Sequence, residues 1–425
     1  MDLSKSVIID TDPGIDDALA IMLASLSPRM DILAITLVYG NVEMQLIKKN
    51  AVVILNALAD STPTKAKKVP VLAVGALSPL QTQPPDATYF HGKDGLGMIY
   101  DKLYPNPKDW ERQLSDPSIS RGFIPTPRDA ADEILYQLRQ APPLTCTLIA
   151  LGPLTNLAVA YERDAATFSR ARQIVIMGGA VNVPGNITAF AEFNFRCDPL
   201  AAKIIMGASR GFDPMHLQTR VKLLEQHQVA PCHVVLMPLD ATEDGTISKA
   251  DYDRYIVPLD SSNCLFRLIK AFMRWSFEAT KDYYDLDEWA VYDAYAVYLA
   301  LELMHDKVDT NKWHYEYLDL TVETQGTYTL GMCCLDRREY QKDKTSWDKN
   351  PPNNVQTFLK GDRQGFRTTF INTVFDAHLV DSVLLWSESW KARLKERVRH
   401  ALMTRKKAVP DSCRGKTLIP IAEFE

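Results

Sequence analysis

The sequence is poor in cysteine and does not arrange its cysteines as a metal site or a redox pair. Seven cysteines occur among 425 residues, with no Cys-x-x-Cys pair and no histidines at metal-ligand spacing. A structural zinc site or a disulfide scaffold is therefore not expected. An odd number of scattered cysteines favours reduced thiols, as in a cytosolic or nuclear protein.

Charge of one sign and long apolar runs are also missing. The 48 basic and 53 acidic residues are spread along the chain and leave a net charge of −5. No basic field therefore points to nucleic acid or to a membrane surface. No apolar run reaches about 20 residues, the length of a membrane span, and the first strand near Val7 leaves no room for a signal peptide. We expect a cytoplasmic protein with a small-molecule ligand, no nucleic acid partner and no membrane.

Short apolar runs alternate with amphipathic helical patterns up to about residue 210. Strands are predicted near Val7 and over residues 32–38, 69–74, 144–151 and 174–177. This alternation predicts an α/β fold with a Rossmann-like, mostly parallel sheet flanked by helices. Ligands bind such sheets at the carboxyl ends of the strands. One rim is therefore expected to hold the residues that follow predicted strands: Asp12, Asn41, His91, Leu151 and Asn186.

The remaining patterns complete a single domain over residues 1–425. Helices are predicted over residues 261–304, a small β-hairpin over 315–335 and a helical C-terminal extension over 373–407. Polar stretches near 100–127 and 339–364 are interpreted as insertions, the second of them a loop. The C-terminal helix is expected to pack on the domain or on a second subunit.

The densest polar motif is residues 10–17, Asp-Thr-Asp-Pro-Gly-Ile-Asp-Asp, which lies between the first strand and a helix. Carboxylates this close repel each other unless a cation neutralises them or one keeps its proton, and oxygen-only ligands favour calcium or magnesium over zinc. The motif therefore predicts a hard-cation site. Two alternatives stay open: one or two of the aspartates cap the helix, or the Asp-x-Asp belongs to a haloacid-dehalogenase-like phosphatase.

Residues 7–18 closely resemble the N-terminal signature of the inosine/uridine-preferring nucleoside hydrolase family. Further matches follow in family order: residues 36–42 (Thr-Leu-Val-Tyr-Gly-Asn-Val), 91–97 (His-Gly-Lys-Asp-Gly-Leu-Gly), 151–158 (Leu-Gly-Pro-Leu-Thr-Asn-Leu-Ala), the segment 177–199 and 291–294 (Val-Tyr-Asp-Ala). Together they cover residues 6–335. The phosphatase alternative explains only the first of these matches.

The resemblance implies calcium-dependent hydrolysis of the N-glycosidic bond of ribonucleosides, giving ribose and free base, within purine/pyrimidine salvage. It implies that Asp12 is both the general base and a metal ligand, and that the other Ca²⁺ ligands are Asp17, the Leu151 carbonyl and Asp293. It implies a second group that binds the ribose and the base: Asp16, Asn41, Asn186, Glu192, Phe193 and Asn194. Asp10 is expected to support the ligands from behind.

Each of these residues also has a structural interpretation. Asn194 could bond its own loop, Asp293 could cap a helix and Asn41 could sit in a turn. Their occurrence together, in family order, favours the functional interpretation. A homo-oligomer is also expected.

The sequence departs from the family at the leaving group. Tyr292 stands where members that favour inosine and uridine carry a histidine that protonates the base, and tyrosine, with a pKa of about 10, is a poor proton donor. His91 matches the other histidine of the base site. Tyr292 and His91 are thus the candidate acids. Two functions stay open: a nucleoside N-ribohydrolase, or a catalytically weak ribosyl-ligand-binding homologue that lacks acid catalysis of base departure.

Overall fold

The sheet that organises this protein is built from short strands that are mostly buried on both faces. The computed structural model describes residues 6–61, 68–81, 88–102, 109–304, 308–337 and 351–375. Within them a nine-stranded sheet has the order β10-β13-β7-β6-β5-β1-β2-β3-β4. Its strands are β1 (Ser6–Thr11), β2 (Asp31–Leu37), β3 (Val71–Val74), β4 (Ile124–Pro125), β5 (Cys146–Ala150), β6 (Gln173–Met177), β7 (Val234–Met237), β10 (His314–Leu318) and β13 (Val355–Lys360).

The sheet is parallel except at one edge. β1 pairs in parallel with β2 and with β5, and only the edge strand β10 runs antiparallel, against β13. Every residue of β5 and β6 is buried, as expected for parallel strands that are covered on both faces and therefore read as continuous apolar runs. The predicted α/β fold and the five predicted strands are confirmed.

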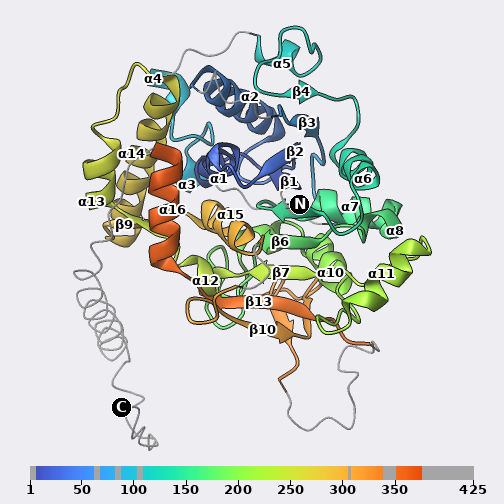
Figure 1. Cartoon of the computed structure of the whole chain (residues 1–425). Coiled ribbons are helices and arrows are strands. Elements are labelled where there is room, and N and C mark those ends of the chain that lie inside the picture. The colour runs from blue at the N-terminus through green and yellow to red at the C-terminus, as the bar shows by residue number, and fades with distance from the viewer. Residues whose placement is uncertain are drawn as a thin grey trace, which may run out of the picture. The chain divides into compact units, whose positions relative to one another are not determined.

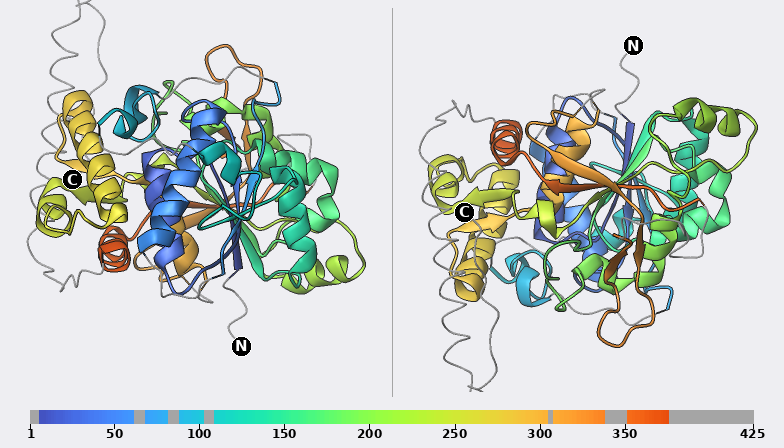
Figure 2. Two further views of the ribbon diagram at one scale, coloured as in Figure 1. Left: turned by 90° about the horizontal axis from the view of Figure 1, so that it is seen from above. Right: turned by 90° about the horizontal axis from the view of Figure 1, so that it is seen from below.

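Helices form a layer on each face of the sheet (Figures 1 and 2). One layer contains α1 (Ile15–Leu26), α2 (Met44–Ser61) and α15 (Tyr292–Glu302), and the other contains α6 (Ala130–Gln140), α7 (Thr155–Arg163) and α10 (Pro199–Gly207). The long helix α14 (Cys264–Tyr284) packs outside the first layer, against α1 and α2. The other helical segments are α3 (Thr88–His91), α4 (Ile99–Lys102), α5 (Trp110–Gln113), α8 (Ala165–Phe168), α9 (Phe193–Cys197), α11 (Leu217–Glu225), α12 (Leu239–Thr242), α13 (Lys249–Asp251), η1 (Tyr252–Ile256) and α16 (Arg363–Phe375).

The predicted hairpin and loop are corrected in part by the structure. β11 (Leu320–Val322) and β12 (Cys333–Leu335) form the expected antiparallel pair, but β10 leaves it to join the main sheet. The predicted loop at 339–364 is wrong from Val355 onward, because β13 inserts there between β7 and β10 and α16 follows it. Its run Val-Gln-Thr-Phe-Leu has strand propensity, which the surrounding polar residues obscured.

The predicted insertion at 100–127 contains α5 and the edge strand β4, which pairs with β3. A second two-stranded sheet joins β8 (Thr246–Ser248) to β9 (Glu288–Ala290). The predicted C-terminal helix beyond Phe375 lies outside the described residues. Among those that are described, no helix has both the length and the apolar character needed to cross a membrane, and the six cysteines are free thiols.

Candidate metal and active site

The turn between β1 and α1 buries two aspartates of the acidic motif. β1 ends at Thr11 and α1 begins at Ile15, so Asp12 lies in the turn and Asp17 in the first helical turn. The Asp17 carboxylate accepts hydrogen bonds from the Thr11 hydroxyl at 2.5 Å, the Asp12 amide at 3.2 Å and the Gly14 amide at 3.0 Å. The same hydrogen bonds therefore fix the start of α1 and the position of the Asp17 carboxylate, because the unpaired amides at a helix N-terminus need such acceptors.

Asn41 connects the two aspartates from the neighbouring strand. It follows β2, and its amide donates to Asp12 Oδ2 at 2.8 Å while its side-chain Nδ2 donates to Asp17 Oδ2 at 2.9 Å. Asp12 is also confined sterically, since a Cβ at Gly40 would lie 1.9 Å from its Oδ2 and a Cβ at Gly152 would lie 2.4 Å from its Oδ1. These contacts leave the Asp12 carboxylate one orientation.

A third buried carboxylate belongs to α15, a helix far from the acidic motif in the sequence. Asp293, in the first turn of α15, is buried, and helix α15 packs along α1. Single oxygen atoms of Asp16, Asp17 and Asp293 all lie within 4.8 Å of one another. Asp16, which the resemblance assigns to the ribose, therefore lies directly beside the predicted metal ligands.

Burial raises the pKa of every carboxyl group in this cluster, and repulsion between carboxylates adds to the effect for Asp12, Asp17 and Asp293. Burial raises the pKa of Asp16 to about 6. Burial first, and then the charge of Asp17, holds the pKa values of Asp12 and Asp293 well above their usual range. Like charges in a low-dielectric site disfavour ionisation, so the ionised cluster requires a cation.

The donor set fits a hard divalent cation. All side-chain donors are carboxylate oxygens, and Asp12 Oδ1 is buried without a hydrogen-bond partner among the described residues. The Leu151 carbonyl follows β5 at the same rim and accepts a hydrogen bond from Asn194 Nδ2 at 2.7 Å, which leaves it a second lone pair. Buried orphan oxygens of this kind are costly unless a ligand satisfies them.

Asp10 supports the rim from within the sheet. Its Oδ1 accepts from the Thr36 hydroxyl at 2.5 Å and from Asn156 Nδ2 at 2.8 Å, and its backbone carbonyl accepts from the Leu151 amide at 2.8 Å. Burial raises its pKa to about 7. The side chain thus ties β1 to β2 and to the start of α7.

The segment after β6 places the predicted ribose residues. Glu192 is the N-cap of α9, and its buried carboxylate accepts from the amides of Asn194, Phe195 and Gly179. This cap orients Asn194, whose side chain donates to the Leu151 carbonyl. Asn186 is exposed and accepts from the Phe193 amide at 2.9 Å. The sequence analysis did not anticipate the capping role of Glu192.

His91 lies against the start of α1. Its Nδ1 accepts from the Ile15 amide at 3.2 Å and lies 3.9 Å from Asp16 Oδ1. Burial lowers its pKa to about 4, so the ring is neutral at physiological pH and carries its proton on Nε2. The predicted residue is therefore at the rim, as a hydrogen-bond donor.

A buried asparagine that the sequence analysis missed connects the loop after His91 to the turn between β1 and α1. Asn50 of α2 is fully buried and donates from Nδ2 to the Pro13 carbonyl at 2.9 Å and to the Asp94 carbonyl at 3.0 Å. The Tyr100 hydroxyl donates to its Oδ1 at 2.9 Å. No local signal distinguishes this asparagine from an ordinary polar residue of an amphipathic helix.

Tyr292 begins α15, immediately before Asp293, and its hydroxyl donates to Glu243 Oε1 at 2.7 Å. Burial, followed by the charge of Glu243, raises its pKa well above 10, whereas a catalytic acid needs a lowered value. Sequence reasoning missed Glu243. Of the nearby aromatic side chains, Trp289 is buried in the core, and Tyr283 and Tyr284 are exposed.

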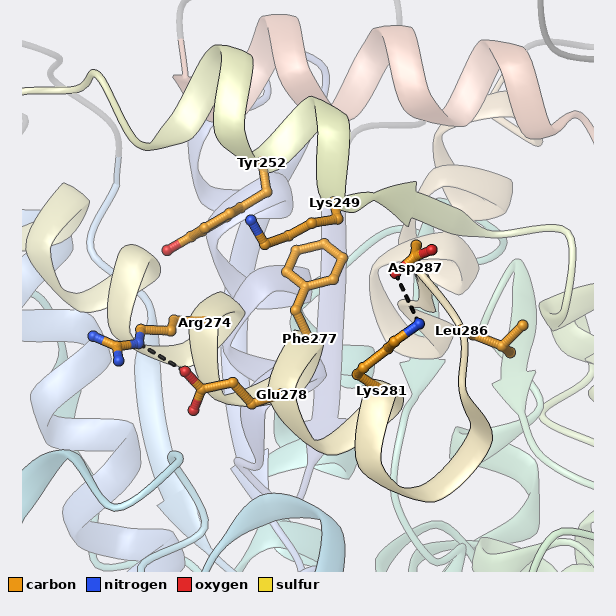
Figure 3. A pocket seen from close by; sticks show the side chains of 8 residues that line it. All are labelled: Lys249, Tyr252, Arg274, Phe277, Glu278, Lys281, Leu286 and Asp287. Atoms are coloured by element: carbon orange, nitrogen blue, oxygen red, sulfur yellow. Dashed lines mark hydrogen bonds and ion pairs between the residues drawn. The ribbon is translucent and has the colours of Figure 1, made fainter.

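A pocket of about 460 Å³ beside α13, η1 and α14 includes none of these residues (Figure 3). Its cations are matched by acidic neighbours: Lys249 lies 2.6 Å from Asp253, Arg274 lies 2.9 Å from Glu278 and Lys281 lies 3.4 Å from Asp287. Because its polar groups satisfy one another, we assign it no part in the chemistry.

Known relatives match the chain over most of its length. An uncharacterised protein of Schizosaccharomyces pombe is 30% identical over 78% of this chain and 88% of its own. The inosine-uridine preferring nucleoside hydrolase of Crithidia fasciculata is 28% identical over 79% of this chain and 89% of its own. Uridine nucleosidase 1 of Arabidopsis thaliana is 37% identical, but the match spans only 59% of that protein and 52% of this chain.

Solved structures agree with these matches. A plant nucleoside hydrolase has a TM-score of 0.68 at 26% identity, covering 88% of this chain and 99% of its own. An inosine-guanosine nucleoside hydrolase has a TM-score of 0.67 at 26% identity, covering 88% of this chain and 100% of its own. The family model for inosine-uridine preferring nucleoside hydrolases matches residues 7–368. The chain therefore belongs to this family of enzymes, which act on N-glycosyl bonds.

Proposed function

We propose that the protein is a calcium-dependent ribonucleoside N-ribohydrolase that releases ribose and free base. The observation that carries this proposal is the carboxylate cluster of Asp16, Asp17 and Asp293, whose oxygens lie within 4.8 Å of one another, with the buried Asp12 bonded to Asp17 through its amide. A cation would stabilise the ionised form of this cluster. We place the protein in the cytoplasm, in purine and pyrimidine salvage, and as a homo-oligomer.

The metal would be held by Asp12, Asp17, Asp293 and the Leu151 carbonyl. Calcium takes about six to eight oxygen ligands and tolerates irregular geometry, which suits carboxylates that also accept protein hydrogen bonds. When bound, it would supply positions for the attacking water and for the 2′- and 3′-hydroxyls of ribose.

The protein side chains would then perform the proton transfer and the positioning. Asp12, held by the Asn41 amide, would accept the proton of the attacking water. Asp16 would accept hydrogen bonds from the ribose hydroxyls, and Asn194 would assist it with a further hydrogen bond to them. Such contacts reject other sugars, because a lost partner leaves a buried polar group unsatisfied.

The other predicted residues would contact the 5′ end and the base. Asn186 and Glu192 are proposed to face the 5′-hydroxyl, with Glu192 in addition holding Asn194 through its helix cap. Phe193, which is partly buried, is proposed to stack on the base.

Departure of the base needs a hydrogen-bond donor other than Tyr292. The Tyr292 hydroxyl donates its one hydrogen bond to Glu243. We therefore assign hydrogen-bond donation to the departing base to the Nε2–H of His91. The same observation favours one alternative: a homologue that binds ribosyl ligands but hydrolyses them poorly, because it lacks an acid at Tyr292.

Ribose release from a panel of ribonucleosides, with chelator and after calcium is restored, tests the two functions. The enzyme releases ribose only when calcium is present. The alternative binds nucleosides in calorimetry, yet releases no more ribose than the Asp12→Asn variant. A rate unaffected by exhaustive chelation would exclude the metal.

A further inference from the structure

The hydroxyl of Tyr292 and the carboxylate of Glu243 form a pair that the proposed reaction does not use. Glu243 directly follows α12, in the connection after β7, and is exposed, whereas Tyr292 begins α15 and is partly buried. Their 2.7 Å hydrogen bond joins two segments that are 49 residues apart.

The pair lies next to the carboxylate cluster. Tyr292 directly precedes Asp293, whose carboxylate lies within 4.8 Å of oxygens of Asp16 and Asp17. Ribose hydroxyls are proposed to bind at that cluster, so the base attached to the ribose must project from it. Tyr292 shares the first turn of α15 with Asp293, and the exposed Glu243 is bonded to it, so this pair is the candidate to meet the edge of that base.

The hydrogen bond fixes what this pair can offer a ligand. A phenol has one O–H donor, and that of Tyr292 donates a hydrogen bond to Glu243 Oε1. The phenol oxygen keeps lone pairs, and an ionised carboxylate has about four acceptor sites, of which this bond uses one. The pair therefore presents acceptors and no donor, whereas a histidine in place of Tyr292 could present an N–H.

We propose that Tyr292 and Glu243 select the nucleobase, favouring bases that turn an exocyclic amino group toward the pair over bases with a carbonyl at that position. This inference rests on the proposed function and names the substrate class: aminated nucleosides such as cytidine and adenosine. An amino group donates to both acceptors. A carbonyl oxygen would face two acceptors and lose its hydrogen bond, which discriminates by about 10- to 100-fold.

Two matched pairs of nucleosides isolate this effect. Cytidine and uridine differ in the amino or oxo group at position 4, and adenosine and inosine differ likewise at position 6. We expect kcat/KM of the natural protein to favour the aminated member of each pair by about 10-fold or more. A ratio cancels general losses of folding or of catalytic power.

Glu243→Gln is the informative variant, because a carboxamide of the same shape adds an N–H donor. The ratio of aminated to oxo substrate should fall by about 10-fold or more, and Tyr292→Phe should lower it as well. Glu278→Gln, at an exposed glutamate that pairs with Arg274, is the control and should leave the ratio unchanged. An unchanged ratio in Glu243→Gln, or a natural preference for the oxo member, overturns the inference.

p-Nitrophenyl riboside separates this failure from failure of the proposed function. Its cleavage by the natural protein shows ribosidase activity without base recognition, so an unchanged nucleoside ratio then counts against the selecting pair alone. If no riboside is cleaved, the proposed function fails. Calorimetric affinities for cytidine and uridine then carry the test, and Glu243→Gln must bring them together for the inference to survive.

Discussion

Replacing Gly40 by alanine would press a methyl group against the Asp12 carboxylate. The added Cβ would lie 1.9 Å from Asp12 Oδ2 and 2.8 Å from its Cγ, where ordinary contact begins at 3.4 Å. Gly40 lies outside the left-handed region of the backbone, so the effect is steric. The carboxylate would have to move by roughly 1.5 Å, and a shift of about 1 Å in a reacting group costs about 10²-fold in rate.

We therefore expect Gly40→Ala to lose about 10²-fold or more in kcat/KM for ribonucleosides and to bind calcium more weakly, while the protein stays folded. The control is Gly207→Ala at the end of α10, where nothing lies within 4 Å of the added Cβ. It should keep full activity and gain up to about 1 kcal/mol of stability. Ribose release and calorimetric unfolding measure both variants. A folded Gly40→Ala protein with activity within a few-fold of the natural chain would refute the positioning assigned to Asp12.

Further predictions concern the base, the metal and the leaving group. Asp12→Asn should abolish ribose release while nucleoside affinity weakens far less, because a general base acts on the transition state; retained turnover would show that Asp12 is not the base. In metal-free protein the carboxyl groups of Asp10 and Asp16 have pKa values of about 7 and about 6, against an ordinary 3.8. Between the ordinary and the raised pKa, the folded chain therefore holds protons that the unfolded chain has lost. Their contribution to stability is complete below about pH 4 and disappears as pH rises through about 6 to 7. Calcium should therefore raise Tm much more at pH 8 than at pH 5, and equal shifts at both would contradict this. p-Nitrophenyl riboside, a good leaving group, should be cleaved much faster than inosine or uridine, and Tyr292→His should narrow that gap by up to about 10²- to 10⁴-fold. Similar rates on all three substrates, together with an inert Tyr292→Phe, would mean that base departure is assisted elsewhere.

Local patterns predicted the central sheet because parallel strands covered on both faces are apolar along their whole length. The strands β1, β2, β3, β5 and β6 each contain such an apolar run, with polar residues at one or both ends of β1, β2, β5 and β6. β13 lies in a polar neighbourhood. The places of β7 and β13 in the sheet depend on pairing with distant strands, which no short window of sequence contains.

The site residues also differ in whether the local sequence could predict them. Asp12, Asp16 and Asp17 lie within one turn of chain, so their mutual repulsion could be inferred from spacing alone. Asp293 required the family resemblance, because only the packing of α15 on α1 brings it to them. Neither Asn50 nor Glu243 belongs to a recognisable motif. Each acts through partners that lie far away in the sequence.

A crystal structure of the calcium-bound protein shows whether the rim holds a metal. We expect one calcium ion with oxygen atoms of Asp12, Asp17, Asp293 and the Leu151 carbonyl at about 2.3–2.6 Å. A calcium ion bound away from this rim, or a rim left empty at saturating calcium, would contradict it.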